Sequence, residues 1–188
     1  MKNLINSYFD QLKKCLDSLN YDEIINVVNI MEEARKKHKK IFIFGNGGSA
    51  ATASHFAGDV NKGVSCGQKI RYRMVALTDN VPTIMAYAND VSYDDVFVEQ
   101  LKNFIDDGDI IIGISGSGNS KNVLKAIEYA NSRGNITIGI TGYTGGILKD
   151  VSKYSVNAKI DDMQIAEDIH MILTHLLMKL LIKQGEIC

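Results

Sequence analysis

Two histidine–carboxylate pairs are the residues of this sequence best suited to acid–base or metal chemistry. His55 and Asp59 are four residues apart in a segment that favours a helix, so both side chains point to one helix face. Glu167 and His175 are eight residues apart in a second helical segment and lie loosely on one face, with His170 on an adjacent face. Histidine beside a carboxylate can transfer protons near neutral pH or bind a divalent metal, and the spacing does not choose between these roles. Each pair alone is also compatible with an ordinary, partly buried hydrogen-bonded position.

A glycine turn precedes the first of these helices. The apolar run Lys40–Phe44 favours a strand buried on both faces, and residues 45–48 (Gly-Asn-Gly-Gly) break it with a sharp turn. Ser49 then stands where a helix N-cap is expected. Free backbone N–H groups at such a helix start can receive a phosphate or another anion. The turn matches neither the Walker lysine loop nor the dinucleotide fingerprint, so it indicates neither ATP nor NAD, and a tight turn without a ligand remains the alternative.

A serine-rich loop follows another expected strand, Asp109–Ile114. Ser115, Ser117 and Ser120 place three hydroxyls within six residues, and the intervening glycines let the backbone fold around a small group. Hydroxyls and backbone N–H groups without a lysine suit a terminal phosphomonoester better than a triphosphate, which usually needs a cation and Mg²⁺. The alternative is an ordinary loop that caps the following helix. Together with the glycine turn on a neighbouring strand, the loop favours a phosphate site.

Alternating strands and helices position these residues, and they predict an α/β fold with three α-β-α layers around a parallel sheet. The expected strands are Lys40–Phe44, Met74–Thr78, Asp109–Ile114, Ile136–Thr141 and a short fifth, Tyr154–Ala158. The expected helices run from Ser49 to Lys62, from Pro82 onward, over Tyr93–Ile105, over Lys121–Arg133 and over Asp162–Lys183. Ligands of such sheets bind beyond the carboxyl ends of the strands, which is where the glycine turn and the serine loop lie.

Two amphipathic helices, residues 3–19 and 21–37, precede every strand, with Asp22 as a possible cap of the second. We expect them to lie outside the sheet and to bind a partner subunit. Residues 1–38 then serve oligomerisation, and residues 39–188 form the α/β core of a single domain. The last helix is apolar on much of its circumference, so we expect the sheet and another subunit to bury it.

Bulk properties exclude several classes of protein. The net charge of −1 gives no basic excess for nucleic acid, and the basic run Lys36–Lys40 is interpreted as a solvated helix end. Cys15, Cys66 and Cys188 show neither zinc nor disulfide spacing, which suits a reducing cytoplasm. The sequence starts without a signal-peptide core, and polar residues interrupt the last helix, so we expect a cytoplasmic protein that spans no membrane.

Several motifs in combination closely resemble the sugar isomerase (SIS) superfamily and, within it, the sedoheptulose-7-phosphate (phosphoheptose) isomerase family. They are Gly45-Asn46-Gly47-Gly48-Ser49-Ala50, His55-Phe56-Ala57, Ala88-Asn89-Asp90, Gly113-Ile114-Ser115-Gly116-Ser117-Gly118-Asn119-Ser120 and the tail Asp161–His170. The resemblance implies a flavodoxin-like five-stranded parallel sheet, a homotetramer with active sites between subunits, and conversion of sedoheptulose 7-phosphate to D-glycero-D-manno-heptose 7-phosphate for nucleotide-activated heptoses.

The resemblance also assigns roles to residues. The catalytic residues fall on Asp59 and His175, which would act through an enediol. The substrate-binding residues fall on Asn46, Gly47, Gly48, Ser49, Asn89, Asp90, Ser115, Gly116, Ser117, Ser120, Gln164 and Glu167, with the serine loop holding the phosphate. Some members bind zinc, and that cluster falls on His55, Asp59, Glu167 and His175, one ion per subunit.

The sequence departs from the family at three places. Asp59 stands where Glu is usual, Glu167 stands where Gln is usual, and Lys62-Gly63 replaces a Gly-Arg pair. Lys62, Arg71 and Arg73 are the candidates to compensate for the missing arginine. The alternatives are a non-catalytic SIS scaffold that binds a replication initiator or another protein, a sugar-phosphate-sensing regulator domain, and an isomerase of a different sugar phosphate such as arabinose 5-phosphate.

Overall fold

The computed structural model describes residues 1–186, so Cys188 lies outside the described residues. A parallel sheet of five strands in the order β2-β1-β3-β4-β5 forms the middle layer. The strands are β1 (Lys40–Gly45), β2 (Arg73–Ala76), β3 (Ile110–Ser115), β4 (Ile136–Thr141) and β5 (Tyr154–Asn157). The chain leaves β1 toward β2 at one edge and then returns to β3, so the topological switch point lies between β1 and β3. The predicted five-stranded parallel α/β fold is confirmed.

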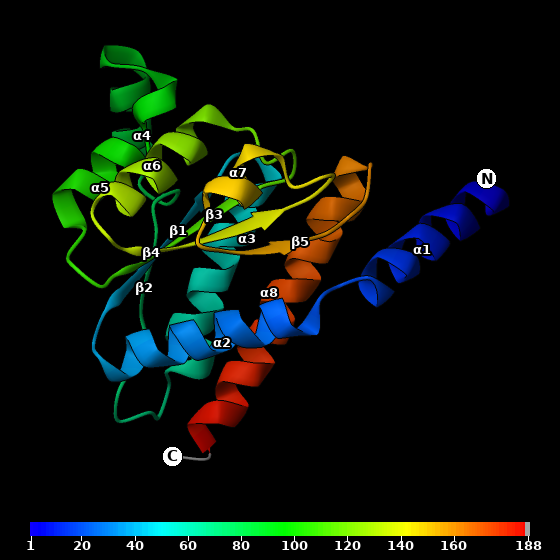
Figure 1. Ribbon diagram of the computed structural model, residues 1–188, viewed down its shortest axis with the longest axis horizontal. Coiled ribbons are helices and arrows are strands. Elements are labelled where there is room, and N and C mark those ends of the chain that lie inside the picture. Colours follow the sequence, from blue (N-terminus) through cyan, green and yellow to red (C-terminus); the bar gives the residue numbers. More distant parts are fainter. Residues whose placement is uncertain (187–188) are drawn as a thin grey trace.

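Helices cover both faces of this sheet (Figure 1). They are α1 (Lys2–Asp17), α2 (Tyr21–Lys36), α3 (Gly48–Gly58), α4 (Val81–Asp90), α5 (Val98–Phe104), α6 (Lys121–Ser132), α7 (Gly146–Val151) and α8 (Met163–Glu186), with a π-helical turn η1 (Asp59–Val64) and a 3-10 turn η2 (Tyr93–Asp95). Successive strand residues point to opposite faces, so each face has its own core. Ile41 and Ile43 pack with α2, α3 and α8, whereas Phe42 and Phe44 pack with α5, α6 and α7.

The two leading helices differ in how they pack. α2 lies outside the sheet but contributes Ile24, Val28 and Met31 to the first core, so the α/β core expected over residues 39–188 also includes α2. Its N-cap is Asn20 rather than the predicted Asp22, because the Asn20 side chain accepts hydrogen bonds from the backbone N–H groups of residues 22 and 23.

α1 projects away from the body of the molecule (Figure 1). It is attached to α8 by a small apolar cluster around Cys15 and by a 2.5 Å hydrogen bond from the Tyr8 hydroxyl to Asp168. That carboxylate raises the pKa of Tyr8 to about 12. The remaining apolar side chains of α1, Leu4, Ile5 and Phe9, are exposed.

Two local predictions need correction. The helix expected over Tyr93–Ile105 is divided into η2 and α5, because the chain bends at residues 96–97 to bury Val96 and Phe97. The short helix α7 was not predicted, since its six residues are too few for a periodic pattern; Leu148 anchors it in the second core.

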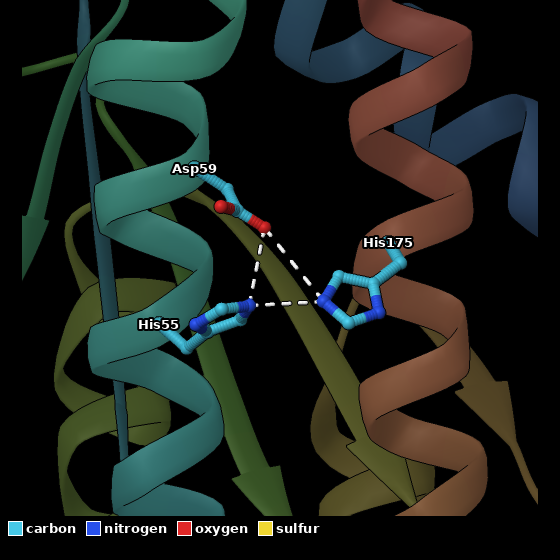
Figure 2. A group of neighbouring side chains, drawn as sticks. All are labelled: His55, Asp59 and His175. Carbon is cyan, nitrogen blue, oxygen red and sulfur yellow. Dashed lines mark hydrogen bonds and ion pairs between the residues drawn. The ribbon is translucent and has the colours of Figure 1, made fainter.

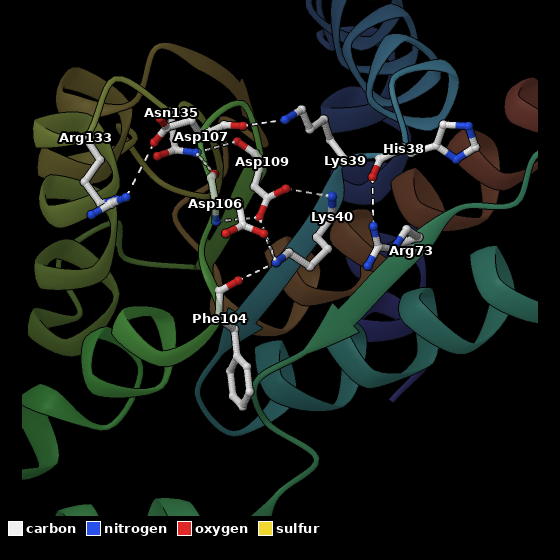
Figure 3. Close-up of polar contacts among 10 residues, drawn as sticks. All are labelled: His38, Lys39, Lys40, Arg73, Phe104, Asp106, Asp107, Asp109, Arg133 and Asn135. Atoms are coloured by element: carbon white, nitrogen blue, oxygen red, sulfur yellow. Dashed lines mark hydrogen bonds and ion pairs between the residues drawn. The ribbon is translucent and has the colours of Figure 1, made fainter.

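The basic run before β1 belongs to a polar network at the amino ends of the strands (Figure 3). Lys39 Nζ donates to the carbonyl of Asp107 at 2.6 Å, and Lys40 Nζ lies 2.7 Å from a carboxylate oxygen of Asp106. Buried Asp109 accepts from the backbone N–H of Lys40 at 2.8 Å. These lysines therefore hold the loop before β3, which corrects the interpretation of the run as merely a solvated helix end.

None of the helices within residues 1–186 is both long and apolar enough to cross a membrane.

Candidate active site

His55, Asp59 and His175 meet where α3 and α8 run side by side (Figure 2). The Nε2 atom of His55 lies 2.9 Å from Nε2 of His175 and 3.3 Å from Oδ2 of Asp59, and this Oδ2 atom lies 3.9 Å from His175 Nε2. The side chains of His55, Asp59 and His175 are 48%, 23% and 52% exposed, respectively. The two helices that the sequence could not place together therefore do meet, and they bring two imidazoles and a carboxylate onto one accessible surface.

α3 and its π-helical continuation contact α8 at two glycines. Gly48 lies against the carboxylate of Glu167, and Gly63 lies against the end of the Met178 side chain. A Cβ atom at either glycine would overlap the end of a flexible side chain on α8, which would have to move. Residue numbers rise along both helices from one contact to the next, so the helices run parallel and His55 faces His175 between the two glycine contacts.

α-Helical hydrogen bonding changes to the π-turn η1 at Asp59. Asn61 within this turn is fixed to the edge strand β2, because its Nδ2 donates to the Met74 carbonyl at 2.7 Å and its Oδ1 accepts from the Met74 N–H at 3.1 Å. Such π-turns are uncommon and often occur at functional sites. Asp59 therefore stands at a helix irregularity that is attached to the sheet.

Glu167, which was expected in the same metal cluster, lies apart from these three residues. The donor atoms of His55, Asp59 and His175 are all within 4.8 Å of one another, and Glu167 is not in this group. Its carboxylate lies beside Gly48 instead, and along α8 it is eight residues, about 12 Å, before His175.

The serine loop follows β3 and is supported by the start of the segment after β4 and by α7. Ser115 and Ser120 share a hydrogen bond of 3.0 Å between their hydroxyls. The carbonyls of Gly116 and Gly118 accept from the backbone N–H groups of residues 142 and 148, each at 2.8 Å. Gly118 has φ +69°, and a Cβ there would overlap the Gly145 carbonyl, so only glycine fits. The loop is thus a fixed feature at the switch point.

The glycine turn lies beside the serine loop, because β1 and β3 are paired in register from Ile41 with Ile110 to Gly45 with Ile114. Its helix starts one residue earlier than predicted. Gly47 occupies the N-cap position of α3 without a side-chain cap, and Ser49 is buried in the first turn, so Ser49 is not the N-cap.

Two residues at the switch point were missed by the sequence analysis. Asn122 on α6 and Tyr93 in η2 both hydrogen-bond to the side chain of Asn46 in the glycine turn. Asn122 was detectable as a polar residue on the face of α6 that also carries the buried Ala126 and Ala130. Tyr93 carried no such signal, since its exposed ring lies in a short irregular segment.

The other residues expected to bind the sugar lie at the surface of the single chain. Asn89 and Asp90 are exposed at the end of α4 and bond to one another at 2.7 Å. Gln164 is exposed in the first turn of α8, next to Met163, whose sulfur lies against Gly116 of the serine loop.

Comparison with known proteins identifies the family of this chain. The model of the SIS domain family matches residues 7–142. Over 170 residues, 90% of this chain and 93% of the relative, the chain is 37% identical to a probable phosphoheptose isomerase of Thermoplasma acidophilum. It is 36% identical to a phosphoheptose isomerase of Helicobacter pylori over 168 residues, 89% of this chain and 86% of the relative. The chain belongs to the phosphoheptose isomerase family.

A solved phosphoheptose isomerase from Neisseria gonorrhoeae has the same fold, with a TM-score of 0.86, 27% identity and coverage of 96% of this chain and 95% of that chain. The resemblance recognised in the sequence motifs is therefore confirmed.

Arg73, one of the three residues considered as a replacement for the expected arginine, points away from the serine loop of its own chain. The Arg73 guanidinium donates to the carbonyl of His38 at 3.0 Å, at the amino end of β2 (Figure 3). Arg71 precedes the same end of the strand. Both arginines therefore lie at the amino end of the strands, whereas the serine loop of the same chain lies at the carboxyl end. Lys62 is exposed on η1.

His170 lies outside the candidate active site. It is buried, and burial lowers its pKa, although the backbone of Thr141 partly opposes this shift. His170 is therefore a neutral core histidine rather than a proton donor to substrate.

Proposed function

We propose that this chain is an aldose–ketose isomerase that converts sedoheptulose 7-phosphate to D-glycero-D-manno-heptose 7-phosphate for nucleotide-activated heptose biosynthesis. The observation that carries the proposal is the meeting of Asp59 with His55 and His175 on α3 and α8. A scaffold would have no need for the donor atoms of these three groups within 4.8 Å of one another. Membership of the phosphoheptose isomerase family supports the same reaction.

Asp59 and His175 divide the proton transfers in this proposal. Asp59 removes a proton from C1 of the ketose to form an enediol and returns a proton to C2. His175 moves the hydroxyl proton from O1 to O2, so the product contains the same atoms as the substrate. His55 lies 2.9 Å from His175 and holds its ring.

The phosphate is assigned to the serine loop, through Ser115, Gly116, Ser117 and Ser120. The remaining substrate-binding residues are assigned to the sugar: Asn46, Gly47, Gly48, Ser49, Asn89, Asp90, Gln164 and Glu167. Phosphate binding at a distance from the reacting carbons supplies binding energy that positions C1 and C2.

A zinc ion, one per subunit, fits the donor set of His55, Asp59 and His175. Two imidazole nitrogens and a carboxylate oxygen are typical zinc ligands, and three protein ligands leave an open position. Glu167 would complete the proposed metal set only if its side chain turned away from Gly48. When bound, the ion supplies Lewis-acid polarisation of a carbonyl oxygen.

We also propose a cytoplasmic homotetramer with active sites between subunits. The accessible position of the three residues, the exposed apolar face of α1 and the exposed Asn89 and Asp90 support this arrangement, since each would be covered by a neighbouring copy. Neither a nucleic acid nor a membrane is proposed as a partner.

Incubation with sedoheptulose 7-phosphate, with and without added Zn²⁺, followed by NMR of the product, tests the reaction. We expect aldose heptose 7-phosphate from the wild type. Failure with this sugar but turnover of arabinose 5-phosphate would redirect the assignment to another substrate. Failure with both, from a folded protein, would favour a scaffold or a sensor domain.

A further inference from the structure

Four hydrogen bonds, each 2.9 Å long, converge on two asparagine side chains at the switch point. Asn46 Nδ2 donates to Asn122 Oδ1, and Asn122 Nδ2 donates to Asn46 Oδ1. The backbone N–H of Val123 donates to Asn122 Oδ1, and the Tyr93 hydroxyl donates to Asn46 Oδ1. Asn122 is only 2% exposed, so its amide cannot exchange these partners for water.

These bonds determine which way each amide faces. A backbone N–H can only donate, so Val123 requires the oxygen of Asn122 on its side. Asn122 must then direct its NH₂ group at the oxygen of Asn46. That oxygen also accepts from Tyr93, so both of its lone pairs are used, and one of the two N–H bonds of Asn46 is used by Asn122. A single N–H donor of Asn46 remains available at the carboxyl end of β1.

Tyr93 connects this amide pair to the segment that carries Asn89 and Asp90. α4 has no buried residue, and its exposed side chains include Val81 and Met85. The Tyr93 ring is itself 54% exposed, so its hydroxyl is attached by hydrogen bonding rather than by core packing.

An ion pair from Lys125 on α6 to Asp95 at 3.0 Å also holds η2. The backbone N–H groups of residues 94 and 95 bond only locally, to Ser92, and Val96 and Phe97 anchor the chain immediately after the turn. The hydroxyl of Tyr93 is therefore the contact of η2 that reaches the glycine turn.

We propose that Asn122 and Tyr93 are positioning residues that lock Asn46 with one N–H donor facing the sugar phosphate. Asn46 then selects a substrate oxygen that accepts a hydrogen bond at this point, and Tyr93 keeps the end of α4 next to the site. The role toward substrate rests on the proposed isomerase function. The orientation of the Asn46 amide and the attachment of residues 81–95 do not depend on that function, because both exist in the free protein.

Tyr93→Phe removes only the hydroxyl and leaves the exposed ring. We expect KM for sedoheptulose 7-phosphate to rise roughly three- to tenfold with kcat nearly unchanged, as for the loss of one hydrogen bond that orients bound substrate. Amide hydrogen exchange of residues 81–95 should become faster in the absence of substrate. Tyr129→Phe is the matched control, because Tyr129 lies on α6 and no hydrogen bond of its hydroxyl is found within the described residues.

Asn122→Asp tests the amide orientation directly. The variant keeps an acceptor for Val123 and for Asn46 Nδ2 but replaces the NH₂ group with an oxygen that repels Asn46 Oδ1. Turning the Asn46 amide over only sets its oxygen against the other carboxylate oxygen, so nothing fixes which way the Asn46 donor faces. We expect a larger rise in KM than for Tyr93→Phe. A double-mutant cycle of Tyr93→Phe with Asn46→Ala should be strongly non-additive, because Tyr93 acts through Asn46.

Unchanged KM and unchanged exchange in Tyr93→Phe would overturn the proposal, and so would an additive cycle. Because Asn122 is buried, its variant can fail to fold, and the exposed Tyr93 then carries the test alone. If the wild type does not isomerise the sugar, amide hydrogen exchange still decides whether Tyr93 attaches residues 81–95. A failure of the proposed function can therefore be distinguished from a failure of the proposed attachment.

Discussion

The Nε2 atoms of His55 and His175 lie 2.9 Å apart although the two residues are separated by 120 positions in the sequence. At this distance one ring must donate and the other accept, so the two rings cannot both carry a proton on the facing nitrogen. Asp59 Oδ2 faces both nitrogens, at 3.3 and 3.9 Å. A proton shared by the two nitrogens satisfies that pair, and a divalent cation placed among the three atoms satisfies all of them, so the group is suited to proton transfer and to metal binding alike.

Replacement of Asp59 tests its assignment as the base. Asp59→Asn should lower kcat by roughly 10²- to 10⁴-fold, because the amide cannot accept the proton from C1. Circular dichroism and thermal unfolding should match the wild type, since Asp59 lies at the surface of the helix pair. The exposed Asp150 on α7 provides a control of equal charge, and Asp150→Asn should keep full activity. Near-wild-type turnover by Asp59→Asn would remove the residue from the mechanism.

Metal binding should depend on His55, Asp59 and His175 and not on Glu167. We expect His55→Ala and His175→Ala each to weaken Zn²⁺ binding at least tenfold in calorimetric titrations, because each removes one ligand of the group. Glu167→Gln should change the affinity little, since its carboxylate lies beside Gly48. The exposed His38, at the other end of the sheet, provides the control His38→Asn. A large loss of affinity in Glu167→Gln would show that its side chain turns toward the histidines.

The fold was predictable from the sequence because its strands are compact apolar runs with clear breaks. β4 has the predicted bounds, Ile136–Thr141, and the turns after β1 and β3 lie where glycine and serine interrupt such runs. His55 and Asp59 were placed on one face by helical spacing alone, and the structure agrees.

Contacts that depend on how elements pack were not predictable. Asn46 and Asn122 are separated by 76 positions and meet only because β1 pairs with β3 in one register. The meeting of His55 with His175 likewise depends on the parallel alignment of α3 and α8, which contact one another at residues 48 and 63. The π-turn at Asp59 has no counterpart in a pattern of 3.6 residues per turn.

His170 should make the stability of the protein depend on acidic pH. Burial lowers its pKa in the folded state below the value of 6.5 of an unperturbed histidine, so the unfolded state binds a proton more readily. The contribution of neutral His170 is therefore fully present above pH 6.5 and is lost as the pH falls through the lower, folded pKa. In His170→Leu this part of the pH dependence should disappear. Chemical unfolding of both proteins between pH 5 and pH 8 measures the difference, and parallel stability curves would contradict the prediction.

Self-association through α1 provides the last test. Leu4, Ile5 and Phe9 are exposed on a helix that projects from the body, and an apolar surface of this kind marks a contact with another molecule. We expect light scattering to give a tetramer for the wild type and a smaller species for Leu4→Glu and Phe9→Glu, because each variant would bury a charge in the interface. Asn6→Glu adds the same charge to the same helix at an exposed polar position and should leave the assembly intact. If both apolar variants keep the mass of the wild type, α1 is not the contact that builds the tetramer.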